Sequence, residues 1–117
     1  MIFKGISRDF SLLGEEQYDT IGAFWDEMSA IYGLENLIGL GYNWRGTSMS
    51  YAIGLRSGEI PFSNTSLILP DDGWESALGI TENLKEIYDK IYTGGRLDFE
   101  IEVFYEDGRC EIKYHRK

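Results

Sequence analysis

Residues 99–116, FEIEVFYEDGRCEIKYHR, decide the fold, because they contain two β-prone segments joined by Asp107-Gly108. Asp-Gly is among the strongest short hairpin signals, since both residues tolerate the positive φ angles of a two-residue turn. The stretch therefore predicts an antiparallel hairpin with strands over residues 99–106 and 109–116.

A two-residue turn also sets the cross-strand register, and in that register Glu102 lies opposite Lys113. Side chains alternate along a strand, so the hairpin has two faces. One face is apolar and is predicted to form the core beneath the helices: Ile101, Val103, Tyr105, Cys110, Ile112 and Tyr114. The other face mixes charged groups with one phenyl ring: Glu100, Glu102, Phe104, Glu111, Lys113 and His115.

Upstream of this hairpin the same order of elements occurs twice. Residues 74–80 predict a strand, and apolar residues at helical spacing after Thr81 predict a helix that ends at Gly94-Gly95. In the first half, residues 3–10, 37–44 and 49–55 predict strands and 15–32 a helix, with a loop over 57–65. The helix over 15–32 carries one apolar stripe: Ile21, Phe24, Trp25, Met28 and Ile31.

The predicted fold is therefore one α+β domain over residues 1–117, built from tandem strand–helix–strand–strand (βαββ) repeats. The half-repeats are predicted at about residues 1–57 and 66–117. We expect an antiparallel sheet with the helices on one face and a central cleft.

Composition excludes several classes of function. The net charge of −9 disfavours binding to nucleic acid and to anionic membranes, whereas an acidic cleft would attract cations; solubility alone could also explain the charge. Cys110 is the single cysteine and His115 the single histidine, so the chain lacks a second cysteine for a disulfide and enough ligands for a zinc site. No metal or cofactor is expected. The first residues do not resemble a signal peptide, which predicts a cytoplasmic protein.

Small residues recur two apart within the predicted strands. Glycine inside a strand often marks the close approach of a ligand or of another backbone. If they face away from the helices, they form an open floor bordered by Glu102 and Phe104; alternatively, the two repeats pack tightly across them. The pairs are Gly5 and Ser7, Gly39 and Gly41, Ala52 and Gly54, and Ala77 and Gly79.

Several short motifs, in their order along the chain, resemble the gyrase-inhibitor-like (GyrI-like) family. This family also supplies the effector-binding domain of AraC- and MerR-type transcription activators. The resemblance spans nearly the whole chain and rests on Phe24-Trp25, Tyr51-Ala52-Ile53-Gly54, Leu69-Pro70 with Gly73-Trp74, Ser76-Ala77-Leu78, Ile87-Tyr88, residues 100–104 and residues 110–113.

The resemblance implies a stand-alone module whose central cleft binds hydrophobic, often cationic, small molecules. Glu102 matches the glutamate that faces the ligand's charge, and a carboxylate in an apolar cleft is costly unless a cation pairs with it. Lys113 departs from the family pattern and, opposite Glu102, would partly neutralise it. Four aromatic residues are candidates to bind a cation with their ring faces: Phe104, Trp74, Tyr51 and Tyr42.

Two other functions remain open. Some members of the family hydrolyse electrophilic compounds, in which case Glu102 would act as general base and Tyr51 or Tyr42 would orient the water. Alternatively, the acidic domain would bind a protein such as gyrase; a homodimer is also open. A chain of 117 residues leaves no length for a helix-turn-helix segment, so we do not expect it to regulate transcription by itself.

Overall fold

The computed structural model describes residues 1–117 and contains nine regular elements and three short 3₁₀ turns. The first half consists of β1 (Ile2–Ser11), α1 (Gln17–Tyr32), β2 (Leu37–Arg45) and β3 (Ser48–Leu55). After β4 (Thr65–Ile68) come β5 (Trp74–Ile80), α2 (Leu84–Thr93), β6 (Leu97–Phe104) and β7 (Arg109–Arg116). The predicted α+β class is confirmed, and β4 is a strand that the sequence prediction lacked.

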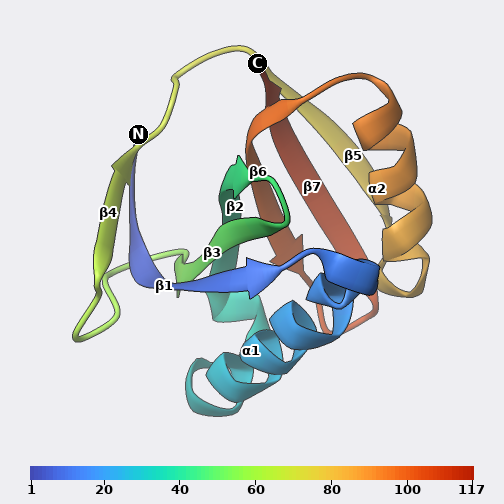
Figure 1. Cartoon of the computed structure of the whole chain (residues 1–117). Coiled ribbons are helices and arrows are strands. Elements are labelled where there is room, and N and C mark those ends of the chain that lie inside the picture. Colours follow the sequence, from blue (N-terminus) through green and yellow to red (C-terminus); the bar gives the residue numbers. More distant parts are fainter.

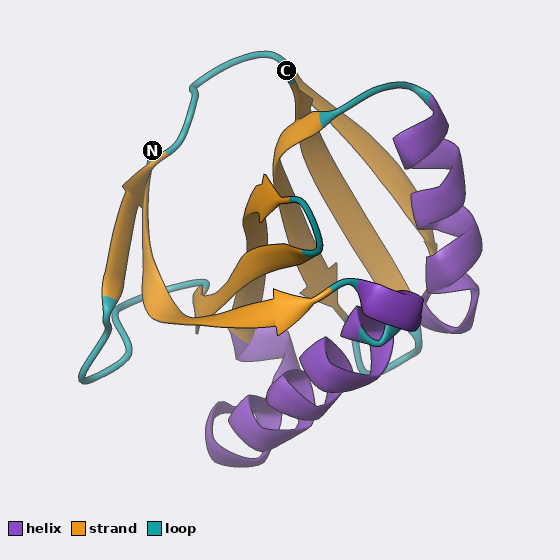
Figure 2. Ribbon diagram, in the orientation of Figure 1, coloured by secondary structure: helices purple, strands orange, loops and turns teal.

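All seven strands belong to one open antiparallel sheet in the order β4-β1-β3-β2-β6-β7-β5. The sheet curves strongly, so that β1 and β4 lie at one side of the molecule and β7 and β5 at the other (Figure 1). The loop between β4 and β5 links the two edge strands across one end of the sheet (Figure 2). The sheet junction between the two halves of the chain is the pairing of β2 with β6.

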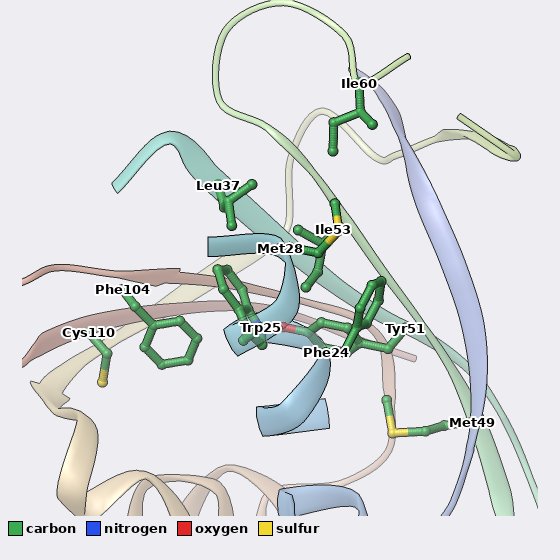
Figure 3. Packing of buried hydrophobic residues seen from close by; sticks show 10 residues of the cluster. All are labelled: Phe24, Trp25, Met28, Leu37, Met49, Tyr51, Ile53, Ile60, Phe104 and Cys110. Carbon is green, nitrogen blue, oxygen red and sulfur yellow. Dashed lines mark hydrogen bonds between the residues drawn. The ribbon is translucent and has the colours of Figure 1, made fainter. Parts of the chain in front are cut away.

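Apolar side chains cover both faces of the sheet. Toward the helices, one cluster consists of Phe24, Trp25, Met28, Leu37, Met49, Tyr51, Ile53, Ile60, Phe104 and Cys110 (Figure 3). Beneath α2 a further cluster consists of Tyr88, Ile91, Leu97 and Ile112. On the opposite face the buried residues are Phe3, Leu40, Ala52, Leu69 and Ile101.

Both helices pack through amphipathic stripes. On α2, Tyr88 and Ile91 are buried, in agreement with the predicted stripe. On α1 the stripe is shorter than predicted, because Met28 is buried whereas Ile31 is 67% exposed. Neither helix combines the length and the apolar character needed to cross a membrane.

The hairpin between β6 and β7 has a different turn from the predicted one. Phe104 pairs with Cys110 and Glu102 with Ile112, so three residues, Glu106 to Gly108, form the loop. Gly108 has φ +91° and its N–H donates to the Tyr105 carbonyl at 3.0 Å. A three-residue loop that ends in a left-handed glycine is the next common hairpin after the two-residue turn. The predicted two-residue turn is therefore wrong.

The changed turn moves the side chains of β6 to the other face relative to β7. A shift of one residue in register reverses the face of every side chain on a strand. Lys113 consequently pairs with Ile101 and not with Glu102, so the predicted neutralising pair does not form. The face toward the helices combines Glu100, Glu102 and Phe104 with Cys110, Ile112 and Tyr114.

We predict that Gly108→Ala lowers the free energy of unfolding by about 1–2 kcal/mol, because an alanine at positive φ is strained. Gly108→Asn should recover part of this loss, since asparagine tolerates the left-handed region. Gly22→Ala in α1 is the control: its Cβ would meet no atom within 4 Å and its φ is helical, so the same substitution there should raise the stability by about 0.5–1 kcal/mol. Urea unfolding measures all three variants, and an unchanged stability of Gly108→Ala would contradict the three-residue loop.

Candidate functional site

A hollow of about 450 Å³, here called the central pocket, lies between the two helices and the sheet face that they cover. This volume falls within the usual range for pockets that bind small organic molecules. Seven of the 19 lining residues are aromatic, and their rings come from α1, α2, β3, β6 and the loop after β6. They are Tyr18, Trp25, Tyr51, Tyr88, Tyr92, Phe104 and Tyr105.

Glu102 extends from β6 into the central pocket and is only 4% exposed. The Tyr51 hydroxyl donates a hydrogen bond to Glu102 Oε1. The Trp25 indole N–H in turn donates to the Tyr51 hydroxyl oxygen at 2.9 Å, and its ring meets Phe104 edge-on with 4.8 Å between centroids. Figure 3 shows Trp25, Tyr51 and Phe104 together in the core beneath α1. The carboxylate is thus bonded by Tyr51 of β3, and Trp25 of α1 holds that tyrosine in place.

Glu100 lies two residues earlier on the same face of β6 and is also 4% exposed. The Tyr92 hydroxyl of α2 donates to Glu100 Oε2 at 3.0 Å. The Tyr92 ring stacks on Tyr88, with 5.5 Å between centroids and 20° between planes. Each of the two carboxylates is therefore bonded by one tyrosine through one of its oxygens.

Two polar groups in the wall have no hydrogen-bond partner. The Tyr88 hydroxyl belongs to a residue that is 4% exposed, and the Gln17 Oε1 atom belongs to the first residue of α1. Buried polar atoms are nearly always hydrogen-bonded, because losing water without replacement is costly. Unpartnered groups around a hollow therefore indicate where polar groups of a ligand would bind.

The central pocket is strongly acidic. Burial raises the pKa of Glu100 well above its ordinary value, the charge of Glu102 raises it further, and the Tyr92 hydrogen bond opposes this. Burial also raises the pKa of Glu102, while the hydrogen bond from Tyr51 and the nearby Tyr88 hydroxyl, which completes no hydrogen bond, act in the opposite direction. No lysine, arginine or histidine lines the pocket. The two carboxylates therefore lack any cationic partner within the protein.

Glycines in β2 make room for both glutamates. Gly39 pairs with Glu102, and Gly41 pairs with Glu100. A Cβ atom at position 39 would collide with the Tyr51 hydroxyl and lie 2.7 Å from the Trp25 ring; at position 41 it would lie 2.7 Å from Glu100 Cγ. Of the two alternatives for the small residues, an open floor facing away from the helices does not hold for Gly39 and Gly41, which lie against side chains on the helix-covered face.

The sequence-predicted site residues divide between the two faces of the sheet. Glu102, Phe104 and Tyr51 come together in the central pocket. Trp74 instead lines a hollow on the opposite face, which Lys113 also lines, and its indole N–H donates to the Pro70 carbonyl at 2.9 Å. Tyr42 packs on that opposite face as well, where its hydroxyl bonds Ser7 Oγ at 2.6 Å.

Several pocket residues were missed by sequence reasoning. Glu100 was placed on the same face as Glu102 but was not chosen as a site residue. The sequence pattern places Tyr88 in the packing stripe of the second helix and gives no role to Tyr92, although residues four apart project from the same helix face and can form one wall. Trp25 was assigned to the core, and it belongs to the core while also lining the pocket.

We predict that Glu100→Gln raises the stability of the protein when the pocket is empty, because a neutral amide costs less to bury than a carboxylate. The raised pKa means that folded wild-type protein binds a proton more tightly than the unfolded chain. Wild-type stability therefore falls as the pH rises above the ordinary glutamate pKa, and the advantage of the variant should widen by up to about 1.4 kcal/mol per pH unit.

Chemical unfolding between pH 5 and pH 8 measures this difference. Glu111→Gln serves as the control, because Glu111 lies on the opposite face of the same hairpin with a side chain 30% exposed. The control makes the same substitution outside the central pocket, and a constant difference between Glu100→Gln and wild type across this pH range would contradict the prediction.

Comparisons with known proteins assign neither a family nor a function to this chain. Searches of protein-family models, of curated proteins and of solved structures find no match to this chain. Function is therefore inferred from the chemistry of the central pocket.

Proposed function

We propose that this protein is a small-molecule-binding module that takes up hydrophobic organic cations in the central pocket. The observation that carries the proposal is the burial of two carboxylates, Glu100 and Glu102, in an aromatic wall without any basic side chain. A ligand cation would supply the missing opposite charge.

The aromatic wall suits the same ligand. Ring faces attract cations through their quadrupole, by about 0.5–2 kcal/mol for each favourable contact. The pocket also offers rings that are already fixed, since Trp25 is bonded to Tyr51 and Tyr88 is stacked on Tyr92. A preformed wall reduces the side-chain entropy that a ligand would lose on binding.

We also propose that the chain is built from tandem βαββ halves and belongs with the GyrI-like proteins that its motifs resemble. In support, the sheet runs β1-β3-β2 and then β6-β7-β5. In each half, the strand that follows the helix, β2 or β6, therefore lies at the junction between the halves. The strand β4 lies between the halves and pairs with β1. Hydrolysis of electrophiles and binding of a protein such as gyrase stay predictions from the resemblance.

The test is a titration with 3-(aminomethyl)biphenyl, a protonated amine, and with the neutral 3-(hydroxymethyl)biphenyl. Tryptophan fluorescence reports binding, because Trp25 lines the pocket. We expect the amine to bind more tightly than the alcohol, and Glu102→Gln to weaken the amine by about 10- to 100-fold, as expected for a lost charge-assisted hydrogen bond.

Glu111→Gln makes the same change of charge on the opposite face and should leave binding unchanged. Equal binding of the amine and the alcohol, or equal weakening by both variants, would refute the pocket as a cation site.

A further inference from the structure

The polar atoms of the central pocket are unevenly distributed between donors and acceptors. Tyr51 bonds Oε1 of Glu102 and Tyr92 bonds Oε2 of Glu100. Neither Glu102 Oε2 nor Glu100 Oε1 receives a hydrogen bond of good geometry. The buried Tyr88 hydroxyl lies near enough to Glu102 to lower the pKa of that carboxyl, but it completes no hydrogen bond. The pocket therefore has acceptors to spare at two separate carboxylates.

From this arrangement, and resting on the proposed function, we infer that the ligand is an organic dication whose two protonated amine groups each bind one of the carboxylates of Glu100 and Glu102. Each amine would donate N–H bonds to the free carboxylate oxygen, and the hydrophobic part of the ligand would lie against the rings.

The spacing limits the ligand further. Residues two apart on one face of a strand lie about 7 Å apart. Two ammonium groups joined by a short spacer, such as a benzene ring with two aminomethyl groups in meta positions, match this separation. Quaternary ammonium groups have no N–H and would leave the free carboxylate oxygens without donors.

Charge balance distinguishes one cation from two. The groups that face Glu100 are Glu102 on its own strand, Tyr88 and Tyr92 on α2, Tyr18 on α1 and Tyr51 on β3, and none is basic. Burial and the neighbouring carboxylate favour a proton on Glu100 in the empty pocket. A monocation needs only Glu102 to be ionised, whereas a dication also requires Glu100 to release its proton to solvent.

The experiment compares three biphenyls with the full chain by calorimetry at pH 8 and pH 5.5. They are 3,5-bis(aminomethyl)biphenyl, the monocation 3-(aminomethyl)-5-methylbiphenyl, and the bis(trimethylammoniomethyl) analogue of the first. We expect the diamine to bind at least tenfold more tightly than the monoamine at pH 8. This advantage should shrink at pH 5.5, and buffers of different ionisation enthalpy should show proton release with the diamine alone.

Variants locate the second charge. Glu100→Gln should abolish the advantage of the diamine while leaving the monoamine within about twofold, whereas Glu102→Gln should weaken both compounds. Glu111→Gln is the control and should change neither.

The outcomes separate the two proposals. If the monoamine binds and the diamine binds no more tightly, or keeps its advantage in Glu100→Gln, the dication is refuted while the cation site stands. If the bis-quaternary analogue equals the diamine, the requirement for N–H donors is refuted. If no cation binds to wild-type protein, the proposed function itself fails, and the inference that rests on it fails as well.

Discussion

Two carboxylates buried side by side on β6 impose most of the demands that the surrounding structure meets. Glu100 and Glu102 are each 4% exposed, and neither has a basic partner. Buried carboxylates persist only where space and hydrogen bonds are provided for them. Here the space comes from the absence of side chains at Gly39 and Gly41 of β2, and the hydrogen bonds come from Tyr51 and Tyr92.

These supports come from different parts of the chain, and they couple the pocket to the packing of the whole fold. The Trp25–Tyr51–Glu102 chain of hydrogen bonds links α1, β3 and β6, and so crosses the β2–β6 junction between the halves. Tyr92 connects α2 to the neighbouring carboxylate. The empty pocket thus combines an aromatic wall that stabilises the fold with buried carboxylates that destabilise it. Binding sites commonly reduce the stability of a protein in this way.

Hydrophobic periodicity and turn residues were sufficient to predict both helices and six of the seven strands, because these elements have strong local signals. The short β4, with Thr65 and Ile68 at its ends, has little apolar alternation and is stabilised by pairing with β1, which no local pattern reveals. The site was predicted only in part. Glu102, Phe104 and Tyr51 come together, whereas Trp74 and Tyr42 lie on the other face. Trp74 follows the face of β7, whose register with β6 was predicted wrongly, and Tyr42 is placed by the pairing of β2 with β6, which no local pattern reveals.

The loop length at the β6–β7 turn decides the electrostatic character of the site. With two loop residues, Lys113 would stand beside Glu102, and a cross-strand pair of that kind satisfies a carboxylate within the protein. With three, Lys113 points to the opposite face and pairs with Glu111 at 3.6 Å, while Cys110 and Ile112 line up beside the glutamates. One residue in a surface turn, made possible by the positive φ of Gly108, therefore separates the positive charge from the negative and leaves the carboxylates available to a ligand.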